Sequence, residues 1–194
     1  MPRREYYVND LGIAYTYGTA PFDRTYESQP THPVIEAIRE MVKIELEKQY
    51  GKKYPMDVCF LNGYEDSSDQ LNYHSDDSEE MDDESPIVIV SLYDTKNITN
   101  KKKQYAREIW FRPSICHVCK VKIGEKHGIY CSVGPAEFTP NALDVQKLEL
   151  ENGSMTIMAP GMQDTHQHRI PKASFDCVKR LSLTFRTYVK PKIK

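Results

Sequence analysis

The sequence predicts an α+β fold in which one helix supports a run of β-strands. The first observation is a set of apolar residues at helical spacing between Pro33 and Gly51. The second is a series of short segments from Val58 onward that are β-branched or alternate between apolar and polar residues. The third is size, because 194 residues with 39% hydrophobic content suffice for one sizeable core. We therefore expect a single domain over residues 1–194.

The predicted helix has signals at both ends. Thr31 can cap its N-terminus, Pro33 suits its first turn and Gly51 can end it. The apolar residues at helical spacing are Val34, Ile35, Ile38, Met41, Val42 and Leu46. We expect this face to pack on a sheet.

Strands are predicted along the rest of the chain. They cover residues 58–61, 71–74, 87–93, 108–111, 148–150, 154–158 and 180–188. Asn152 and Gly153 lie between two of these strands and are typical of a hairpin turn.

The last predicted strand has two different faces. Leu181, Leu183 and Phe185 alternate with a polar set consisting of Arg180, Ser182, Thr184 and Arg186. One interpretation is a polar face in contact with water. The other is a polar face that lines a barrel interior, where the two guanidinium groups need anionic partners. A dicarboxylate such as 2-oxoglutarate would satisfy both guanidinium groups through charge-assisted pairs.

Three residues form a candidate iron site. His74 and Asp76 are two residues apart, so their side chains point the same way in an extended segment. With His168 from another strand they would hold Fe(II) and leave about half of an octahedral shell open for oxygen and a chelating co-substrate. Each residue alone is more often a surface or hydrogen-bonding side chain. His166 is a rival third ligand because it shares strand parity with His168.

Six segments in order resemble the AlkB family of Fe(II)- and 2-oxoglutarate-dependent dioxygenases. They are Leu61-Asn62-Gly63-Tyr64, Tyr73-His74-Ser75-Asp76-Asp77, residues 85–92, residues 153–158, His168-Arg169-Ile170-Pro171-Lys172 and residues 180–186. The resemblance implies a double-stranded β-helix, or jelly-roll, core. It also implies oxidative demethylation of N-alkylated bases in nucleic acid, by hydroxylation and loss of formaldehyde.

The resemblance also implies roles for individual residues. His74, Asp76 and His168 match the iron ligands, and the Arg-Ile-Pro-Lys that follows His168 favours it over His166. The residues that match the 2-oxoglutarate contacts are Asn62, Tyr64, Arg180 and Arg186.

Two positions depart from the family pattern. Ser182, a co-substrate contact by position, stands where the family often has Asn, which removes one hydrogen bond to 2-oxoglutarate. Ser78 followed by Glu79 stands where the family has an acidic residue two positions after the iron-binding Asp. Glu79 is therefore a candidate substrate contact, and base recognition stays open.

Residues 1–30 combine aromatic residues with turn formers. Such residues often only cover an irregular surface. The resemblance implies instead a nucleotide-recognition lid, with Tyr15, Tyr17 and Phe22 as candidates to stack on an extruded base.

Residues 113–145 read as an insertion between barrel strands, too long for a simple hairpin. Cys116, Cys119, His127 and Cys131 offer four ligands at spacings that a tetrahedral zinc accepts, separate from the iron. His117 is disfavoured because it lies inside the tight Cys-x2-Cys turn. The alternative is an ordinary cysteine-bearing loop in a reducing compartment.

Charge and hydropathy restrict the partners. A net charge of −2 argues against coating duplex DNA, although lysines 101–103 and the tail 190–194 would serve as phosphate contacts or as solvated segments. We expect a methylated nucleic acid, single-stranded or with a flipped base, and a monomeric protein. The longest apolar run is too short for a membrane span, and the start lacks a secretory signal, so we expect no membrane and an intracellular location.

Two other functions stay open. A same-fold oxygenase acting on a protein side chain or another methylated substrate would keep every core residue. A non-catalytic zinc-bearing binding module is the other alternative, and the His74, Asp76 and His168 set argues against it because a binding module has no need of those residues.

Overall fold

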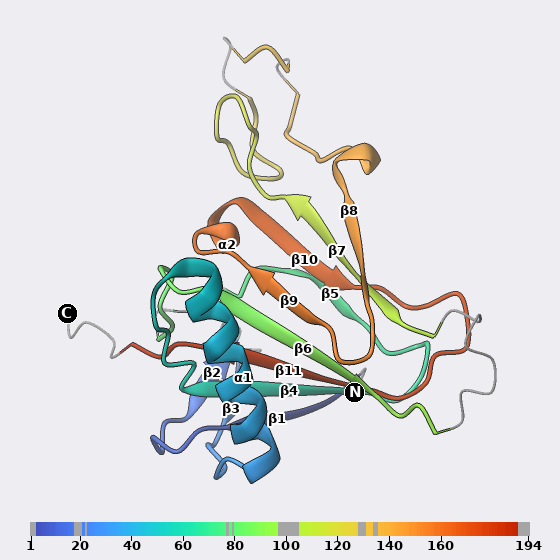
Figure 1. The fold of residues 1–194 in the computed structure, drawn as a ribbon. Coiled ribbons are helices and arrows are strands. Elements are labelled where there is room, and N and C mark those ends of the chain that lie inside the picture. The colour runs from blue at the N-terminus through green and yellow to red at the C-terminus, as the bar shows by residue number, and fades with distance from the viewer. Residues whose placement is uncertain are drawn as a thin grey trace.

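The computed structural model describes residues 3–17, 21, 23–76, 78, 80–96, 105–127, 131–133 and 136–189. Two β-sheets face each other, and one long helix covers the outer side of the larger sheet (Figure 1). The elements are β1 (Arg4–Val8), β2 (Tyr15–Tyr17), β3 (Arg24–Tyr26), α1 (Pro33–Tyr50), β4 (Val58–Tyr64), β5 (Leu71–His74), β6 (Ile87–Tyr93), β7 (Arg107–Pro113), η1 (Ala142–Asp144), β8 (Gln146–Leu150), β9 (Met155–Met158), α2 (Met162–Thr165), β10 (His166–Ile170) and β11 (Arg180–Arg186).

The strands form a jelly-roll arrangement. The larger sheet has the order β1-β4-β11-β6-β9, and the smaller one has the order β5-β10-β7-β8. All of these neighbours are antiparallel. The predicted fold class, a jelly-roll core with one supporting helix, is confirmed. Within the described ranges, no helix is long and apolar enough to cross a membrane.

Helix α1 begins one residue later than the sequence signals suggested. Its N-cap is His32, whose Nδ1 accepts a hydrogen bond from the Val34 amide at 3.2 Å. The predicted cap, Thr31, instead accepts a hydrogen bond from Arg39 Nη2 at 3.1 Å. The C-terminus ends as predicted at Gly51, whose φ of 65° places it in the left-handed region that glycine adopts without strain.

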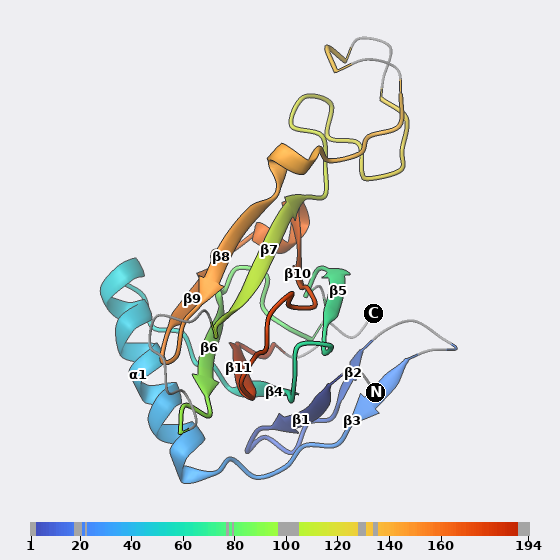
Figure 2. The ribbon, with the colours of Figure 1, turned by 90° about the vertical axis from the view of Figure 1, so that its right-hand side faces the viewer.

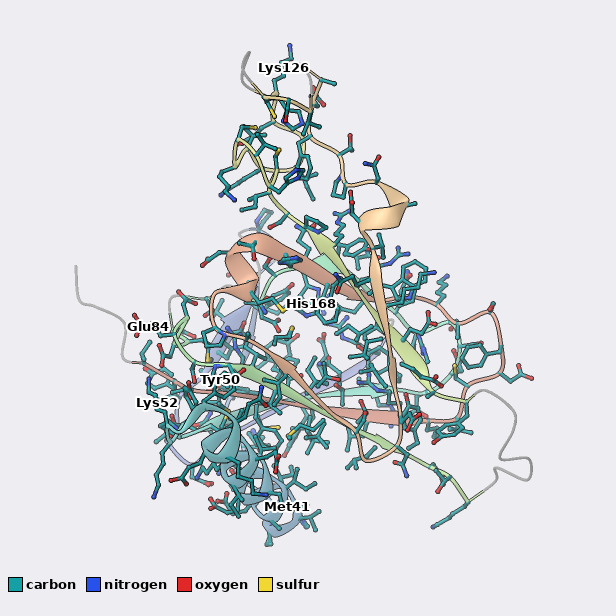
Figure 3. All side chains as sticks on the ribbon, turned by 45° about the horizontal axis from the view of Figure 1, so that its top comes forward. Met41, Tyr50, Lys52, Glu84, Lys126 and His168 are labelled. Carbon is teal, nitrogen blue, oxygen red and sulfur yellow. The ribbon has the colours of Figure 1, made fainter. Side chains whose placement is uncertain are left out.

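The buried face of α1 is narrower than its apolar pattern. Val42 and Leu46 pack into the core of the larger sheet, where Phe185 is fully buried. Val34 and Met41, by contrast, are 58% and 69% exposed. Met41 lies at the outer surface of the helix (Figure 3). Helical spacing therefore identified the element, but only part of its apolar set faces the sheet.

Strand β6 is buried on both faces. Val88 and Val90 belong to the core beneath α1, whereas Ile87 and Ile89 belong to the core between the sheets. A strand in the middle layer of a three-layer stack reads as a continuous apolar run, which explains its uninterrupted Ile-Val-Ile-Val sequence.

The predicted hairpin at Asn152 and Gly153 is wrong. The turn exists, with Gly153 at a φ of 77°. However, β8 pairs with β7 in the smaller sheet and β9 pairs with β6 in the larger one. The turn therefore carries the chain from one sheet to the other, because long-range pairing and not the local turn decides the neighbours of each strand.

The first 30 residues hold two kinds of structure. Strand β1 pairs with β4 along its full length, so it belongs to the larger sheet. Strands β2 and β3 form a separate two-stranded sheet. In Figure 2 this pair lies across the open side of the barrel from β5.

Candidate active site

The three candidate iron ligands converge between the two sheets. The metal-binding atoms of His74, Asp76 and His168 all lie within 4.8 Å of one another. Asp76 Oδ1 is 3.5 Å from His74 Nε2, and Asp76 Oδ2 is 3.6 Å from His168 Nε2. Ligands that share one ion at right angles lie roughly 3 Å apart, so a small inward movement would complete the set. His168 occupies the middle of the molecule in Figure 3.

A bulge in β5 aims His74 into this site. His168 is opposite His74 and Ile170 is opposite Leu71, so two steps on β10 match three on β5. An extra residue of this kind re-aims a side chain without breaking the strand. As a result Leu71 and His74 both face the interior despite their odd spacing.

The His74 ring is also oriented by a hydrogen bond. Its Nδ1 lies 2.8 Å from the Asn72 carbonyl oxygen, to which it donates when it carries the proton. This tautomer leaves Nε2 with a free lone pair toward Asp76 and His168. The rival His166 lies outside the cluster, with its Nδ1 2.9 Å from Thr165 Oγ1. The geometry therefore brings together His168 and not His166.

Burial and mutual charge shift the pKa values of the three groups in different directions. Burial is the largest influence on His168 and lowers its pKa to about 4 despite the nearby Asp76 carboxylate. Burial opposes ionisation of Asp76, but the hydrogen bond with His74 and the charge of His168 hold its pKa well below the usual range. Burial is also the largest influence on His74 and favours a lower pKa, but the hydrogen bond and charge of Asp76, together with the hydrogen bond to the Asn72 carbonyl, outweigh it and raise the pKa. A metal ion binds neutral imidazole and ionised carboxylate, which are the forms that the shifted pKa values of His168 and Asp76 favour.

The polar face of β11 lines the same pocket. Of the two interpretations of its pattern, the structure therefore supports the one in which this face lines the barrel interior. Arg180, Ser182, Thr184 and Arg186 all contribute to the pocket wall. The apolar face of the strand, with Leu183 and Phe185, is buried in the core beneath α1.

Arg180 is held by hydroxyl groups and keeps one donor free. Its Nη2 donates to Ser91 Oγ at 2.9 Å and to Ser182 Oγ at 3.2 Å. Its side chain is buried, and its Nη1 has no hydrogen-bond partner in the described part of the chain. Burial lowers the pKa of the guanidinium. An orphaned cationic donor of this kind is costly unless an anion occupies the space before it.

Arg186 shows the same pattern beside the candidate iron ligands. Its Nη2 donates to the backbone carbonyl of Asp76, while its buried Nε has no partner within the described ranges. Both arginines thus line one pocket and have an unpaired donor, and Arg186 lies next to the His74, Asp76 and His168 cluster. This donor set fits a dicarboxylate bound alongside a metal ion.

Strand β4 supplies the remaining predicted co-substrate contacts. Asn62 and Tyr64 face the pocket directly opposite Ser182 and Arg180 in the β4–β11 register. Burial raises the pKa of the Tyr64 phenol, which therefore stays a neutral hydrogen-bonding group. Asn62 Oδ1 accepts a hydrogen bond from Arg3 Nε at 2.7 Å, which fixes the amide.

Aromatic rings form the opposite wall of the pocket. Tyr15 lies 5.6 Å from Tyr7, 6.1 Å from Phe60 and 6.5 Å from Tyr17, measured between ring centroids. Tyr26 packs edge-on against Phe60 at 5.0 Å. Tyr15 and Tyr17 were predicted substrate contacts and do line the pocket. Phe22 and Glu79, the other two, lie outside the described residues, as do lysines 101–103 and 190–194.

The second candidate metal group is assembled in the insertion. The four ligand atoms of Cys116, Cys119, His127 and Cys131 lie within 4.8 Å of one another. The sulfurs of Cys116 and Cys131 are 3.9 Å apart, and His127 Nδ1 is 3.2 Å from Cys119 Sγ and 3.3 Å from Cys131 Sγ. Two thiolates on one tetrahedral zinc lie roughly 3.8 Å apart, given Zn–S bonds of about 2.3 Å. His117 is exposed and lies outside the group.

A family model for the 2OG-Fe(II) oxygenase superfamily matches residues 7–186. The chain belongs to this superfamily. This membership implies Fe(II) and 2-oxoglutarate as cofactors, and the predicted AlkB-type resemblance is confirmed by the relatives described next.

Curated relatives of this oxygenase are of the AlkB type. The rat "Alpha-ketoglutarate-dependent dioxygenase alkB homolog 3" is 25% identical over 171 residues, which is 88% of this chain and 48% of the relative. The bovine "DNA oxidative demethylase ALKBH2" is 23% identical over 186 residues, 96% of this chain and 53% of the relative. The mouse protein of the same name is 24% identical, with 96% and 62% covered. The chain thus spans about half to three fifths of these relatives.

Some pocket residues of this oxygenase escaped sequence-based prediction. Ser91 anchors Arg180, and Arg3 forms an ion pair with Glu5 at 2.5 Å in addition to its bond to Asn62. Glu5 also accepts a hydrogen bond from the Tyr26 hydroxyl. The β1 sequence Arg-Glu-Tyr-Tyr-Val has no apolar-polar alternation that would mark Glu5 as inward-facing, and its pairing with β4 has no local signal.

Proposed function

We propose that this protein is an oxidative demethylase of N-alkylated bases in nucleic acid. The observation that carries the proposal is a single pocket in which the His74, Asp76 and His168 cluster meets unpaired arginine donors and a wall of aromatic rings. Relatives whose names describe DNA oxidative demethylases support the same activity.

The residues of the pocket would have different roles. His74, Asp76 and His168 would hold the iron, and Arg180, Arg186, Asn62 and Tyr64 would hold 2-oxoglutarate, with Ser182 acting through Arg180. Iron with 2-oxoglutarate and oxygen supplies the oxidising chemistry that hydroxylates an N-alkyl carbon, and the hydroxylated group leaves as formaldehyde. The hydrogen bond from Arg186 to the Asp76 backbone ties the co-substrate side of the pocket to the metal side.

The aromatic wall would hold the base. Burial raises the pKa values of Tyr15 and Tyr17, so both phenols stay neutral. Their flat apolar faces can stack on the planar ring of a base. A base inside a stacked duplex cannot reach a site enclosed between two sheets, so the substrate enters as a flipped or single-stranded nucleotide. One chain supplies every residue of this pocket, which fits a monomeric enzyme.

Product formation from single-stranded oligonucleotides tests this function. Wild-type protein with Fe(II), 2-oxoglutarate and ascorbate should release formaldehyde from oligonucleotides carrying N-methylated bases, at least as fast from single strands as from duplexes. The Asp76→Ala variant should release none, while a His32→Ala variant, altered only at the α1 cap, should stay active. A strict preference for a methylated peptide over every oligonucleotide would contradict the proposal and favour a protein substrate.

We also propose that the insertion binds a structural zinc ion through Cys116, Cys119, His127 and Cys131. The distances already described fit a closed tetrahedral site, and Cys116 and His127 are buried in a segment with little other core. The T-shaped contact of His127 with Phe138 at 5.7 Å braces the ring. Figure 1 shows this segment projecting from the ends of β7 and β8, beyond the two sheets. Such a loop needs a metal to order it.

Elemental analysis tests the zinc site. Protein purified without chelators should carry about one zinc per chain, and this zinc should survive mild chelation that removes the iron. Cys116→Ser with Cys119→Ser should lose it, whereas Cys177→Ser, a cysteine outside the insertion, should keep it. Decarboxylation of 2-oxoglutarate should continue in all of these variants because the barrel is separate. Zinc-free protein would leave the cluster as an ordinary cysteine-bearing loop.

A further inference from the structure

The outer face of the smaller sheet carries alternating aromatic and cationic side chains from four adjacent strands. Arg169 of β10 lies between Tyr73 of β5 and Trp110 of β7, with its guanidinium carbon 4.8 Å and 4.2 Å from the two ring centroids. Lys147 of β8 follows, its Nζ 4.2 Å from the Trp110 ring. Arg112 lies over Tyr73 at 3.9 Å. These five side chains form what we call the cation–aromatic row.

The row lies on the face of the smaller sheet that points away from the active site, because side chains along a strand alternate between its two faces. His168 and Ile170 face the pocket, so Arg169 between them faces outward. Trp110 is opposite Arg169 on one side and Lys147 on the other, in continuous register across three strands. One short segment of β10 therefore contributes to the candidate iron site on one face and to the row on the other.

The cations of the row lack anionic partners. Across the described ranges, neither Arg112, Arg169 nor Lys147 forms an ion pair with a carboxylate within 4.0 Å. Among the described residues, Arg112 donates side-chain hydrogen bonds only to the neutral Gln167 Oε1, at 3.1 Å and 2.7 Å, and the buried Arg169 Nε has no hydrogen-bond partner.

The acidic residues on the same face do not cancel this charge. Glu108 is engaged by the Trp110 indole, whose Nε1 donates to it at 2.7 Å. Glu149 lies directly across from Glu108 on β8, so the two carboxylates gather at one end of the sheet. Arg112 lies toward the other end of β7, opposite Gln167, whereas Arg169 and Lys147 lie level with Trp110 in the middle of the strand. The three cations of the row thus face two carboxylates, and Arg112 is the cation farthest from them along the strand.

The row also begins beside the entrance to the pocket. β5 is the edge strand of the smaller sheet, and its Leu71 and His74 line the pocket while Tyr73 lies on the outer face. The other wall comes from Tyr15 and Tyr17 of the β2–β3 pair. Figure 2 shows β5 at the margin of the barrel facing that pair. A strand that delivers one base between these walls must pass the β5 edge.

We propose that the cation–aromatic row binds the sugar–phosphate backbone of the nucleic-acid strand that flanks the base in the pocket. This inference rests on the proposed function, because it takes the polyanion to be the substrate strand. Arg112, Arg169 and Lys147 contact phosphates, and the rings of Tyr73 and Trp110 hold the cations in place beforehand through cation–π contacts. Restraining these long side chains in advance lowers the entropy lost on binding.

The salt dependence of binding tests the row. The affinity for an unmethylated single-stranded oligonucleotide is measured by fluorescence anisotropy over a range of salt concentrations. Arg112→Gln with Arg169→Gln removes two phosphate contacts, so the slope of log K against log salt should shrink by about 1.4, at about 0.7 per contact on single strands. Lys43→Gln with Lys48→Gln removes two charges from α1, on the other side of the molecule, and should leave the slope unchanged.

Two further measurements separate this role from a structural one and from the proposed function itself. Arg112→Lys with Arg169→Lys keeps both charges and should retain most of the slope. If the glutamine variant lowers the unfolding temperature but leaves the slope as in the wild type, the row is structural and the inference is wrong. In that case a wild type that still demethylates oligonucleotides preserves the proposed function. A wild type that neither binds nor demethylates any oligonucleotide overturns both.

Discussion

Replacement of Arg180 by Met should separate co-substrate binding from stability. Met fills a similar length of pocket without the charge, so it removes the unpaired Nη1 donor along with the bonds to Ser91 and Ser182. Exchanging a buried cation for an apolar side chain is often neutral or stabilising when its partner is absent. In the absence of 2-oxoglutarate we therefore expect the free energy of unfolding to stay within about 1 kcal/mol of the wild type.

The expected loss in 2-oxoglutarate affinity is much larger. Arg180 is 2% exposed, so the co-substrate carboxylate that it pairs with is desolvated as well. Truncating one partner of a buried, hydrogen-bonded charge pair costs about 2–5 kcal/mol, which corresponds to roughly 30-fold to 5,000-fold in Kd. Arg180→Lys should fall between the wild type and Arg180→Met, because a lysine keeps the charge but cannot form the planar two-point contact.

Thermal unfolding with and without 2-oxoglutarate provides the assay. Saturating ligand stabilises the wild type in proportion to the logarithm of its concentration over Kd, and this shift should disappear in Arg180→Met at the same concentration. Lys179→Met is a matched control, since it removes a neighbouring charge that is exposed and paired with Glu65. A ligand-induced shift in Arg180→Met equal to that of the wild type would refute the assignment of Arg180 to the co-substrate.

Other substitutions test the metal site and the core. Turnover should be abolished, with the fold retained in circular dichroism, by each of the substitutions His74→Ala, Asp76→Ala and His168→Ala. His166→Ala should keep most of the activity because its ring lies outside the cluster. If His166→Ala abolished turnover and His168→Ala did not, the third ligand would be His166. Phe185→Ala should lower the free energy of unfolding by about 3–5 kcal/mol in a denaturant titration, because this fully buried ring supports the contact between β11 and α1. A loss below about 1 kcal/mol would mean that this core collapses around the gap.

The sequence predicted the parts of the fold that have local signals. β11 shows this best, since its period-two pattern separated an apolar face from a polar one, although it left open whether the polar face meets water or lines the pocket where its two arginines lie. The spacing of His74 and Asp76 likewise indicated a shared direction. In both cases residues close together in the sequence carry the information, although Asp76 lies just beyond the end of β5 and His74 points inward only through a bulge.

The parts that depend on pairing between distant segments were not predictable in this way. The Asn152-Gly153 turn looks like a hairpin, but its flanking strands find partners in different sheets. The bulge that turns His74 inward exists only because β10 lies opposite β5. Local turn and strand preferences are weak compared with the burial of whole strands, so tertiary context decides such cases.

The wall opposite the iron site shows why the substrate is harder to infer than the chemistry. The candidate iron and 2-oxoglutarate contacts lie on β4, β5, β10 and β11 or, for Asp76, just beyond the end of β5, and the pairing of these strands fixes their directions. Glu5, by contrast, joins Arg3, which precedes β1, to the Tyr26 hydroxyl of β3 in a network built from the first 26 residues. Its side chain lines the pocket, with one oxygen paired with Arg3 and the other with Tyr26 and Arg24. Because no spacing rule links these residues, the groups that would contact the base in the proposed reaction depend on how the N-terminal segment folds back onto the barrel.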